Sequence, residues 1–192
     1  MDRVLTIPFA LHQRLIRGRV AFDALFVLGG SALIAIAAQI AIAVPFSPVP
    51  LTMQPLAVLL VGVVLGAKGG AAAATLYLLE GASGLPVFSQ GRGGAMWLAG
   101  PTAGYLLSYP FAAFIAGWFS ERGWGGNVVR AVSGMLAALA VIYLGGWSWL
   151  AVLTDASTAF ATGVAPFIVA DAVKIALGAA MLPYAQRLIT PR

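Results

Sequence analysis

The sequence predicts an all-α integral membrane protein with six transmembrane helices. Two observations predict this class. Hydrophobic residues make up 61% of the 192 residues and charged residues only 9%, whereas a soluble globular domain has about 25% charged residues. Long apolar runs also recur along the chain between breaks that contain Pro, Gly or Arg. The net charge of +5 would suit nucleic acid in a soluble protein, but here it is better explained by basic residues at the ends of membrane helices.

The first apolar run covers residues 22–44 and predicts the first span, since a crossing helix needs roughly 17–25 apolar residues. Residues 1–21 mix apolar side chains with arginines, which predicts a cytoplasmic or interfacial segment. Residues 22–192 then form a single six-helix membrane domain. The Pro-rich segment 45–50 ends the first span, because proline cannot continue a helix.

Two shorter apolar runs follow at residues 52–65 and 71–81, with a Gly-rich turn at 66–70 between them. Both are short for a full crossing. Each is therefore either extended by its flanking residues or re-entrant.

Three further spans are predicted beyond a long Gly-rich loop at residues 81–94. They cover residues 104–119, 131–153 and 165–188, with a polar turn at 120–130 and a loop at 154–163. Thr154, Asp155 or Ser157 is a candidate cap in that last loop. Pro166 suits the first turn of the last span, where its missing N–H is not needed.

The Lys and Arg residues predict the orientation of the six spans. Six crossings place nine of the 11 basic residues on one side of the membrane, whereas five or seven crossings would split them. Cytoplasmic loops carry an excess of Lys and Arg, so both termini are expected in the cytoplasm. Arg92 falls on the opposite side, and Lys174 falls within the membrane. The nine residues are Arg3, Arg14, Arg17, Arg19, Lys68, Arg122, Arg130, Arg187 and Arg192.

Asp171 and Lys174 are the most informative residues, because both are charged within the apolar run of the last span. Charged residues inside membranes are costly and usually face a bundle interior or a ligand. A spacing of i, i+3 places both side chains on one helix face. Three interpretations remain open: an ion pair that locks helices together, a ligand site in which Lys174 binds an anion and Asp171 accepts N–H groups, or a proton-coupled site at Asp171.

Two other segments carry candidate binding residues. The Gly-rich loop and the residues just after it hold Phe88, Gln90 and Trp97, which resemble a cover for a partly apolar ligand more than a plain connector. Thr52 and Gln54 begin the second span, where they either cap the helix or line the same cavity. Tyr105, Tyr109, Trp147 and Trp149 are interpreted as interfacial aromatic residues.

The same residue inventory argues against enzymatic activity. The chain has no Cys and a single His, His12, so thiol chemistry and multi-histidine metal sites are excluded. No phosphate-binding lysine motif follows the glycines of the loop, and Asp171 has no second carboxylate in its span. We expect no catalytic residues, no metal and no cofactor.

Four sequence blocks together form a recognisable pattern. They are Val49-Pro-Leu-Thr-Met-Gln-Pro-Leu-Ala-Val, Tyr77-Leu-Leu-Glu-Gly-Ala-Ser-Gly-Leu-Pro-Val-Phe88, Gly100-Pro-Thr-Ala-Gly-Tyr105 and Asp171-x-x-Lys174. The pattern resembles the BioY family, the substrate-binding S components of energy-coupling factor (ECF) biotin transporters. The resemblance covers nearly the whole chain from the first span to the sixth.

The resemblance implies a six-helix fold with an outward-facing pocket in the plasma membrane of a prokaryote. Biotin would place its carboxylate near Lys174 and its ureido ring near Asp171 and a loop amide, for which Gln90 is the candidate. The family works with a membrane-embedded T protein and two ATPases. Small residues of the first span would contact the T protein: Ser31, Ala35, Ala37 and Ala41. The alternative function is a secondary or proton-coupled carrier for another small carboxylic acid.

Overall fold

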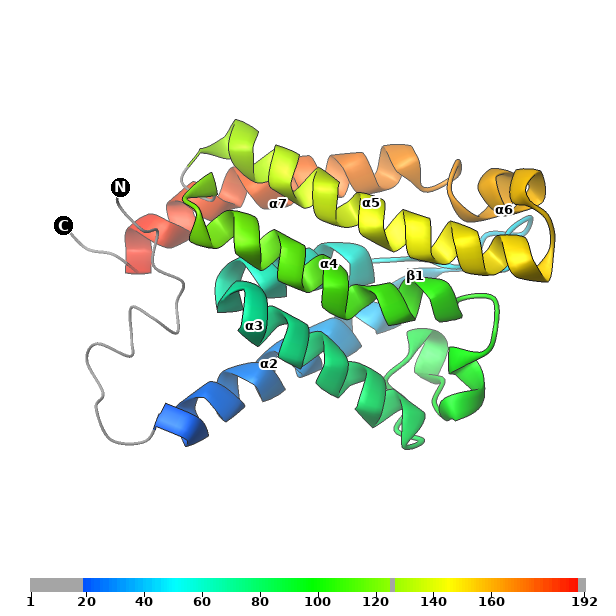
Figure 1. Ribbon diagram of the computed structural model, residues 1–192, viewed down its shortest axis with the longest axis horizontal. Coiled ribbons are helices and arrows are strands. Elements are labelled where there is room, and N and C mark those ends of the chain that lie inside the picture. Colours follow the sequence, from blue (N-terminus) through cyan, green and yellow to red (C-terminus); the bar gives the residue numbers. More distant parts are fainter. Residues whose placement is uncertain (1–18, 125–126, 190–192) are drawn as a thin grey trace.

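The computed structural model describes residues 19–124 and 127–189, which form six helical passes in alternating directions (Figure 1). The passes are α2, the two halves of α3, α4, α5 and the pair α6–α7. The helices are α2 (Arg19–Gln39), α3 (Gln54–Ala82), α4 (Ala103–Glu121), α5 (Val128–Leu153), α6 (Ala156–Gly163) and α7 (Ile168–Ile189). Most of the N-terminal segment predicted at residues 1–21, including His12, lies outside the described residues.

The helices have the length and apolarity of a multi-pass membrane protein. Three of them are long and apolar enough to cross a bilayer, namely α2 from Phe22, α3 and α5. A fourth span arises if α6 and α7, which are bent by 48° at their junction, are counted together. The predicted all-α fold is confirmed, and six helical passes fit the arrangement. The last span is broken differently from the expectation, because α6 occupies the predicted loop and Pro166 lies in the turn before α7.

The predicted turn at residues 66–70 is confirmed in its place but is shorter than expected, because only Gly66 leaves the helical conformation of α3. Its φ of 80° and ψ of 176° are accessible to glycine at little cost. The break frees the amide of Ala67, which donates to Glu121 Oε1 at 2.8 Å. A Cβ on Gly117 would come within 2.4 Å of Ala67 N, so the close approach of α4 at this break also requires glycine.

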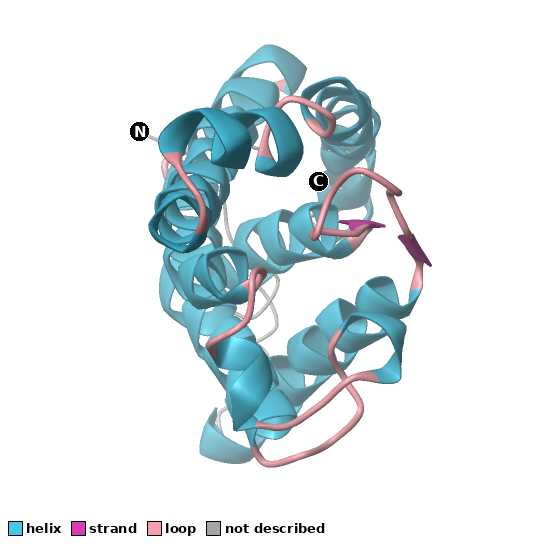
Figure 2. Ribbon diagram, turned by 90° about the vertical axis from the view of Figure 1, so that its right-hand side faces the viewer, coloured by secondary structure: helices cyan, strands magenta, loops and turns pink. Residues whose placement is uncertain are grey.

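The end of the bundle opposite this break is covered by short elements and loops, seen end-on in Figure 2. Strands β1 (Ala41–Ile42) and β2 (Leu51–Thr52) pair antiparallel, with Ala41 opposite Thr52. Two short 3₁₀ helices, η1 (Ser89–Gly91) and η2 (Ala95–Leu98), lie in the loop between α3 and α4. The sequence predicted helix to residue 44, but α2 ends at Gln39 and the chain turns into β1.

Side-chain hydrogen bonds tie these outer segments to one another. Ser47 Oγ, between the two strands, donates to Thr162 O of α6 at 2.7 Å. Tyr105 OH of α4 donates to Gly163 O at 2.7 Å. Asp155 caps α6 by accepting from the backbone N–H groups of Ser157 and Thr158, which confirms its predicted capping role. The loops therefore form one connected cover.

The four small residues predicted to contact a T protein do not share one exposed face: three lie in α2, and Ala41 lies in β1. Ser31 is 0% exposed and Ala37 is 7% exposed, while Ala35 and Ala41 are half-buried. Ser31 Oγ also donates a hydrogen bond to Glu80 of α3. Ser31 and Ala37 therefore pack inside the chain itself, and the contact of the first-span small residues with a T protein stays a prediction.

Candidate functional site

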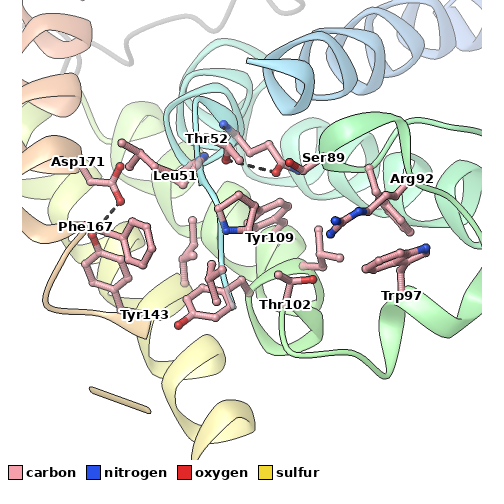
Figure 3. A pocket seen from close by; sticks show the side chains of 18 residues that line it. Leu51, Thr52, Ser89, Arg92, Trp97, Thr102, Tyr109, Tyr143, Phe167 and Asp171 are labelled. Atoms are coloured by element: carbon pink, nitrogen blue, oxygen red, sulfur yellow. Dashed lines mark hydrogen bonds between the residues drawn. The ribbon is translucent and has the colours of Figure 1, made fainter. Parts of the chain in front are cut away.

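A cavity lies beneath the cover of loops and is bounded by the start of α3, the α3–α4 loop, α4, α5 and the start of α7 (Figure 3). The space inside it and in its open mouth together is about 700 Å³. Its walls are mostly apolar, with a few polar groups. The lining residues are Val49, Pro50, Leu51, Thr52, Gln54, Pro55, Phe88, Ser89, Arg92, Trp97, Thr102, Tyr105, Leu106, Tyr109, Ile142, Tyr143, Phe167 and Asp171.

Asp171 is the polar centre of one side of the cavity. It lies in the first turn of α7 and is 3% exposed. Its Oδ1 accepts from Lys174 Nζ at 2.8 Å, and its Oδ2 accepts from Tyr143 OH at 2.8 Å. An ionised carboxylate has about four acceptor positions, so Asp171 retains capacity for further donors. The carboxylate can therefore receive ligand N–H groups.

Lys174 does not line the cavity. Its Nζ donates both to Asp171 and to the carbonyl of Thr52 at 2.8 Å, so it joins α7 to β2. Removing one partner of a buried ion pair destabilises a protein, because the remaining charge is then buried without a partner. Lys174 therefore neutralises Asp171 and holds it in place, and its charge is already balanced without a ligand.

A buried chain of hydrogen bonds connects β2 to the loop over the cavity. Gln54 Nε2 donates to Tyr77 OH at 2.7 Å, and Tyr77 OH donates to Val87 O at 3.3 Å. Thr52 Oγ1 donates to Gln54 Oε1 at 3.3 Å and accepts from Gln54 N at 3.2 Å. Of the two roles that the sequence left open for Thr52, the structure supports the second: Thr52 lines the cavity, whereas the N-cap of α3 is Met53 and has no side-chain capping hydrogen bond.

The loop is fixed from inside by Phe88, which is 3% exposed. Its ring packs edge-on against Tyr77 with centroids 5.6 Å apart. A Cβ on Gly81 would lie 2.1 Å from the Phe88 ring, so the glycine at the end of α3 makes room for it. Phe88 anchors the loop and contributes apolar wall to the cavity.

Arg92 and Ser89 provide the polar groups of the opposite side. Figure 3 shows Arg92 and Trp97 across the cavity from Asp171 and Tyr143. The Arg92 guanidinium carbon lies 4.4 Å from the Trp97 ring centroid. Among the described residues, the one ion pair is Lys174–Asp171, so Arg92 keeps its charge unpaired there. Ser89 Oγ is buried and has no hydrogen-bond partner in the described part of the chain.

Comparison with known proteins places the chain in a family, since the profile of the BioY family matches residues 12–191. The chain belongs to the BioY family. The probable biotin transporter BioY of Pyrococcus horikoshii is 44% identical over 157 residues, which are 82% of this chain and 89% of that protein. The biotin transporter BioY of Rhizobium etli is 43% identical over 147 residues, or 72% and 78% of the two chains. The family predicted from the sequence is confirmed.

A solved structure shares the fold of this BioY-family chain. It is a crystal structure of the S-component for biotin from an ECF-type ABC transporter, and it superposes with a TM-score of 0.80. The alignment covers 89% of this chain and 94% of that chain at 24% identity. The likeness shows that the two chains have the same overall fold.

The structure brings together five of the seven residues that the sequence suggested for this BioY-family site. Asp171, Thr52, Gln54, Phe88 and Trp97 all line the cavity, and their roles in binding stay predictions. Lys174 is not among the lining residues. Gln90 is exposed and is also not among them, so the structure offers no support for its amide as a cavity group.

Sequence reasoning missed Tyr143, Tyr109, Ser89 and Arg92. Tyr105 and Tyr109 were interpreted as interfacial residues, but they are 7% and 4% exposed and line the cavity, so that interpretation is wrong. Tyr143 lies in the middle of the fifth predicted span, where a hydroxyl needs a buried partner. The position of Tyr143 within an apolar span therefore indicates a buried polar contact. Nothing in the sequence distinguishes Ser89 as a cavity residue from the other residues of its loop.

Proposed function

We propose that this protein is the biotin-binding S component of an ECF-type uptake transporter, without enzymatic activity of its own. Its BioY-family relatives are named as biotin transporters, which supports transport. The observation that carries the proposal is a mostly apolar cavity with a buried carboxylate on one side and an unpaired guanidinium on the other. Biotin has the complementary layout, because its ureido ring and its carboxylate are joined by an apolar chain.

The geometry favours one orientation of biotin in the cavity. The ureido N–H groups would donate to Asp171, whose carboxylate oxygens have spare acceptor positions. The biotin carboxylate would pair with Arg92, since a guanidinium forms strong charge-assisted hydrogen bonds with carboxylates. Lys174 would act only through Asp171, which replaces the expectation that it binds the biotin carboxylate.

We place the protein in the plasma membrane of a prokaryote, with the cavity opening to the outside. Lys68 lies two residues after the break in α3, Arg122 follows the end of α4 and Arg130 lies in the first turn of α5, whereas Arg92 lies in the loop between α3 and α4. Excess Lys and Arg mark the cytoplasmic side, so this asymmetry supports cytoplasmic termini and an outward-facing mouth.

The expected partners are a membrane-embedded T protein and two ATPase subunits. Of the residues predicted to contact the T protein, Ala35 and Ala41 remain candidates because they are half-buried rather than enclosed. The outer face of α2 is otherwise apolar, with Leu25, Leu28 and Ile36 between 52% and 65% exposed. This face suits contact with lipid or with a membrane helix.

A secondary or proton-coupled carrier for another small carboxylic acid is the weaker candidate. It would require Asp171 to titrate during transport. Both oxygens of Asp171 already accept hydrogen bonds, one from Tyr143 and one from Lys174, so the carboxylate is held in place to receive ligand N–H groups. The names of the relatives also favour biotin.

Calorimetric titration of the purified protein in lipid nanodiscs with biotin tests the proposed function. We expect saturable binding of biotin and no comparable binding of valerate, which lacks the ureido ring. Lipoate, which has a similar chain and carboxylate but no ureido group, is the second control. An intact, well-folded preparation that does not bind biotin would contradict the proposal.

Replacing Ser89 by Ala is expected to weaken biotin binding without lowering the stability of the ligand-free protein. The Ser89 hydroxyl is buried without a protein partner, so we infer that it bonds to the ligand. Its loss should weaken biotin binding about 5–10-fold, which corresponds to one hydrogen bond of about 1 kcal/mol, and should leave the ligand-free protein as stable or slightly more stable. Calorimetry and thermal unfolding measure the two effects.

Ser120→Ala is the matched control for this prediction. Ser120 is buried in α4 and donates to Val63 O at 2.9 Å, outside the residues that line the cavity. Its loss should lower stability and leave biotin affinity unchanged. Equal biotin affinity in Ser89→Ala and the unmodified protein would show that the Ser89 hydroxyl does not contact the ligand.

A further inference from the structure

Gln39, the last residue of α2, joins that helix to the loop over the cavity. Its side-chain Oε1 accepts from Gly91 N at 2.9 Å. Its Nε2 lies 3.3 Å from Val87 O and 3.2 Å from Phe88 O, and also 3.2 Å from Ala35 O of its own helix. The side-chain amide of Gln39 therefore forms hydrogen bonds with backbone groups on both sides of the turn that contains η1.

The turn held by Gln39 contains one residue, Gln90, in a backbone conformation that its residue type does not favour. Phe88 and Arg92 exchange backbone hydrogen bonds of 2.8 and 3.2 Å across the turn. Between them Gln90 and Gly91 have φ values of 64° and 69°, and Gln90 is the one residue other than glycine with positive φ in the described ranges. Such residues persist only where surrounding contacts hold them in place, and Gln39 supplies contacts of this kind.

This turn carries three cavity-lining residues, namely Phe88, Ser89 and Arg92. Phe88 anchors the turn from inside through its contact with Tyr77. On the α2 side, the side-chain hydrogen bonds to the turn come from Gln39. The placement of Ser89 and Arg92 over the cavity therefore depends on two anchors, one apolar and internal, the other polar and peripheral.

We propose that Gln39 is a positioning residue that holds the turn at residues 88–92 closed over the cavity and so sets how long the ligand stays bound. The inference deepens the proposed function, on which its binding test rests. Gln39 does not touch the ligand, because it is not among the residues that line the cavity. It acts by keeping Ser89 and Arg92 in place.

The binding test compares Gln39→Met with the unmodified full-length protein in nanodiscs. Met has a similar length and apolar stem but no amide, so packing is retained and the hydrogen bonds are lost. We expect biotin to dissociate about tenfold faster, with an association rate that does not fall, since changes of this kind act mainly on dissociation. Ile40→Ala, at the adjacent and 59% exposed side chain, is the control and should leave both rates unchanged.

A spectroscopic test is independent of biotin binding. The chain contains no Cys, so Met96→Cys in the loop and Val152→Cys in α5 can carry a pair of spin labels. Both native side chains are highly exposed, at 83% and 81%. In ligand-free protein, Gln39→Met should broaden the distribution of distances between the labels, because the turn is no longer held to α2. Ile40→Ala should not broaden it.

The two measurements separate failure of this inference from failure of the proposed function. If the unmodified protein does not bind biotin, the proposed function fails, and the label distances still test the role of Gln39. Unchanged distances in Gln39→Met would overturn the inference. So would broadened distances with an unchanged biotin dissociation rate, because the turn would then move without affecting the ligand.

Discussion

Asp171→Asn is expected to abolish biotin binding and to destabilise the protein by about 3 kcal/mol. The substitution leaves Lys174 without its anionic partner in a half-buried position, and breaking a buried pair by removing one charge typically costs about 3–5 kcal/mol. It also places an N–H₂ group where the ligand N–H groups need an acceptor. Thermal unfolding and calorimetric titration with biotin measure the two losses.

The double variant Asp171→Asn with Lys174→Met tests whether Asp171 contacts the ligand or whether the Asp171–Lys174 pair only stabilises the packing of the helices. Removing both charges avoids the unpaired lysine, so stability should return to within about 1 kcal/mol of the unmodified protein. Biotin binding should remain absent, because the acceptor is still missing. Restored binding in the stable double variant would show that the ion pair only supports the fold.

Arg92→Gln is expected to weaken biotin binding about 30–100-fold while the fold is retained. Hydrogen bonds to charged groups contribute roughly 1.5–3 kcal/mol, and Arg92 is the cation on the cavity wall that lacks an acidic partner among the described residues. Glutamine keeps a polar side chain of similar reach beside Trp97 but carries no charge. Isothermal titration calorimetry gives the affinity, and thermal unfolding should show little change.

Biotinamide provides the ligand-side control for Arg92. It has no negative charge, so it should bind the unmodified protein and the Arg92→Gln variant with affinities within about threefold of each other, since a neutral amide gains much less from a guanidinium than a carboxylate does. If Arg92→Gln weakens both ligands equally, Arg92 supports the loop and does not recognise the carboxylate. Lys174→Met would then be tested as the carboxylate site.

Several parts of the site were predictable because their chemistry is visible in the sequence. Asp171 and Lys174 were recognised because charges inside an apolar run are expensive, and Phe88 and Trp97 because aromatic residues are unusual in a plain connector. The single break at Gly66 was not predictable from five residues that include three glycines. Its location depends on the close packing of α4 at Gly117 and on the hydrogen bond from Ala67 to Glu121.

The membrane class, the family, the helical passes and the presence of a buried charged pair follow from the sequence alone, because these depend on composition and on residue spacing along one helix. Which partner each charged or polar side chain meets depends instead on how distant segments pack. Lys174 turns to a carbonyl of β2, Arg92 remains free beside Trp97, and Gln90 is exposed. These roles depend on the directions of side chains from segments far apart in the chain, and a hydrogen bond is formed only where such segments meet at the right distance and angle.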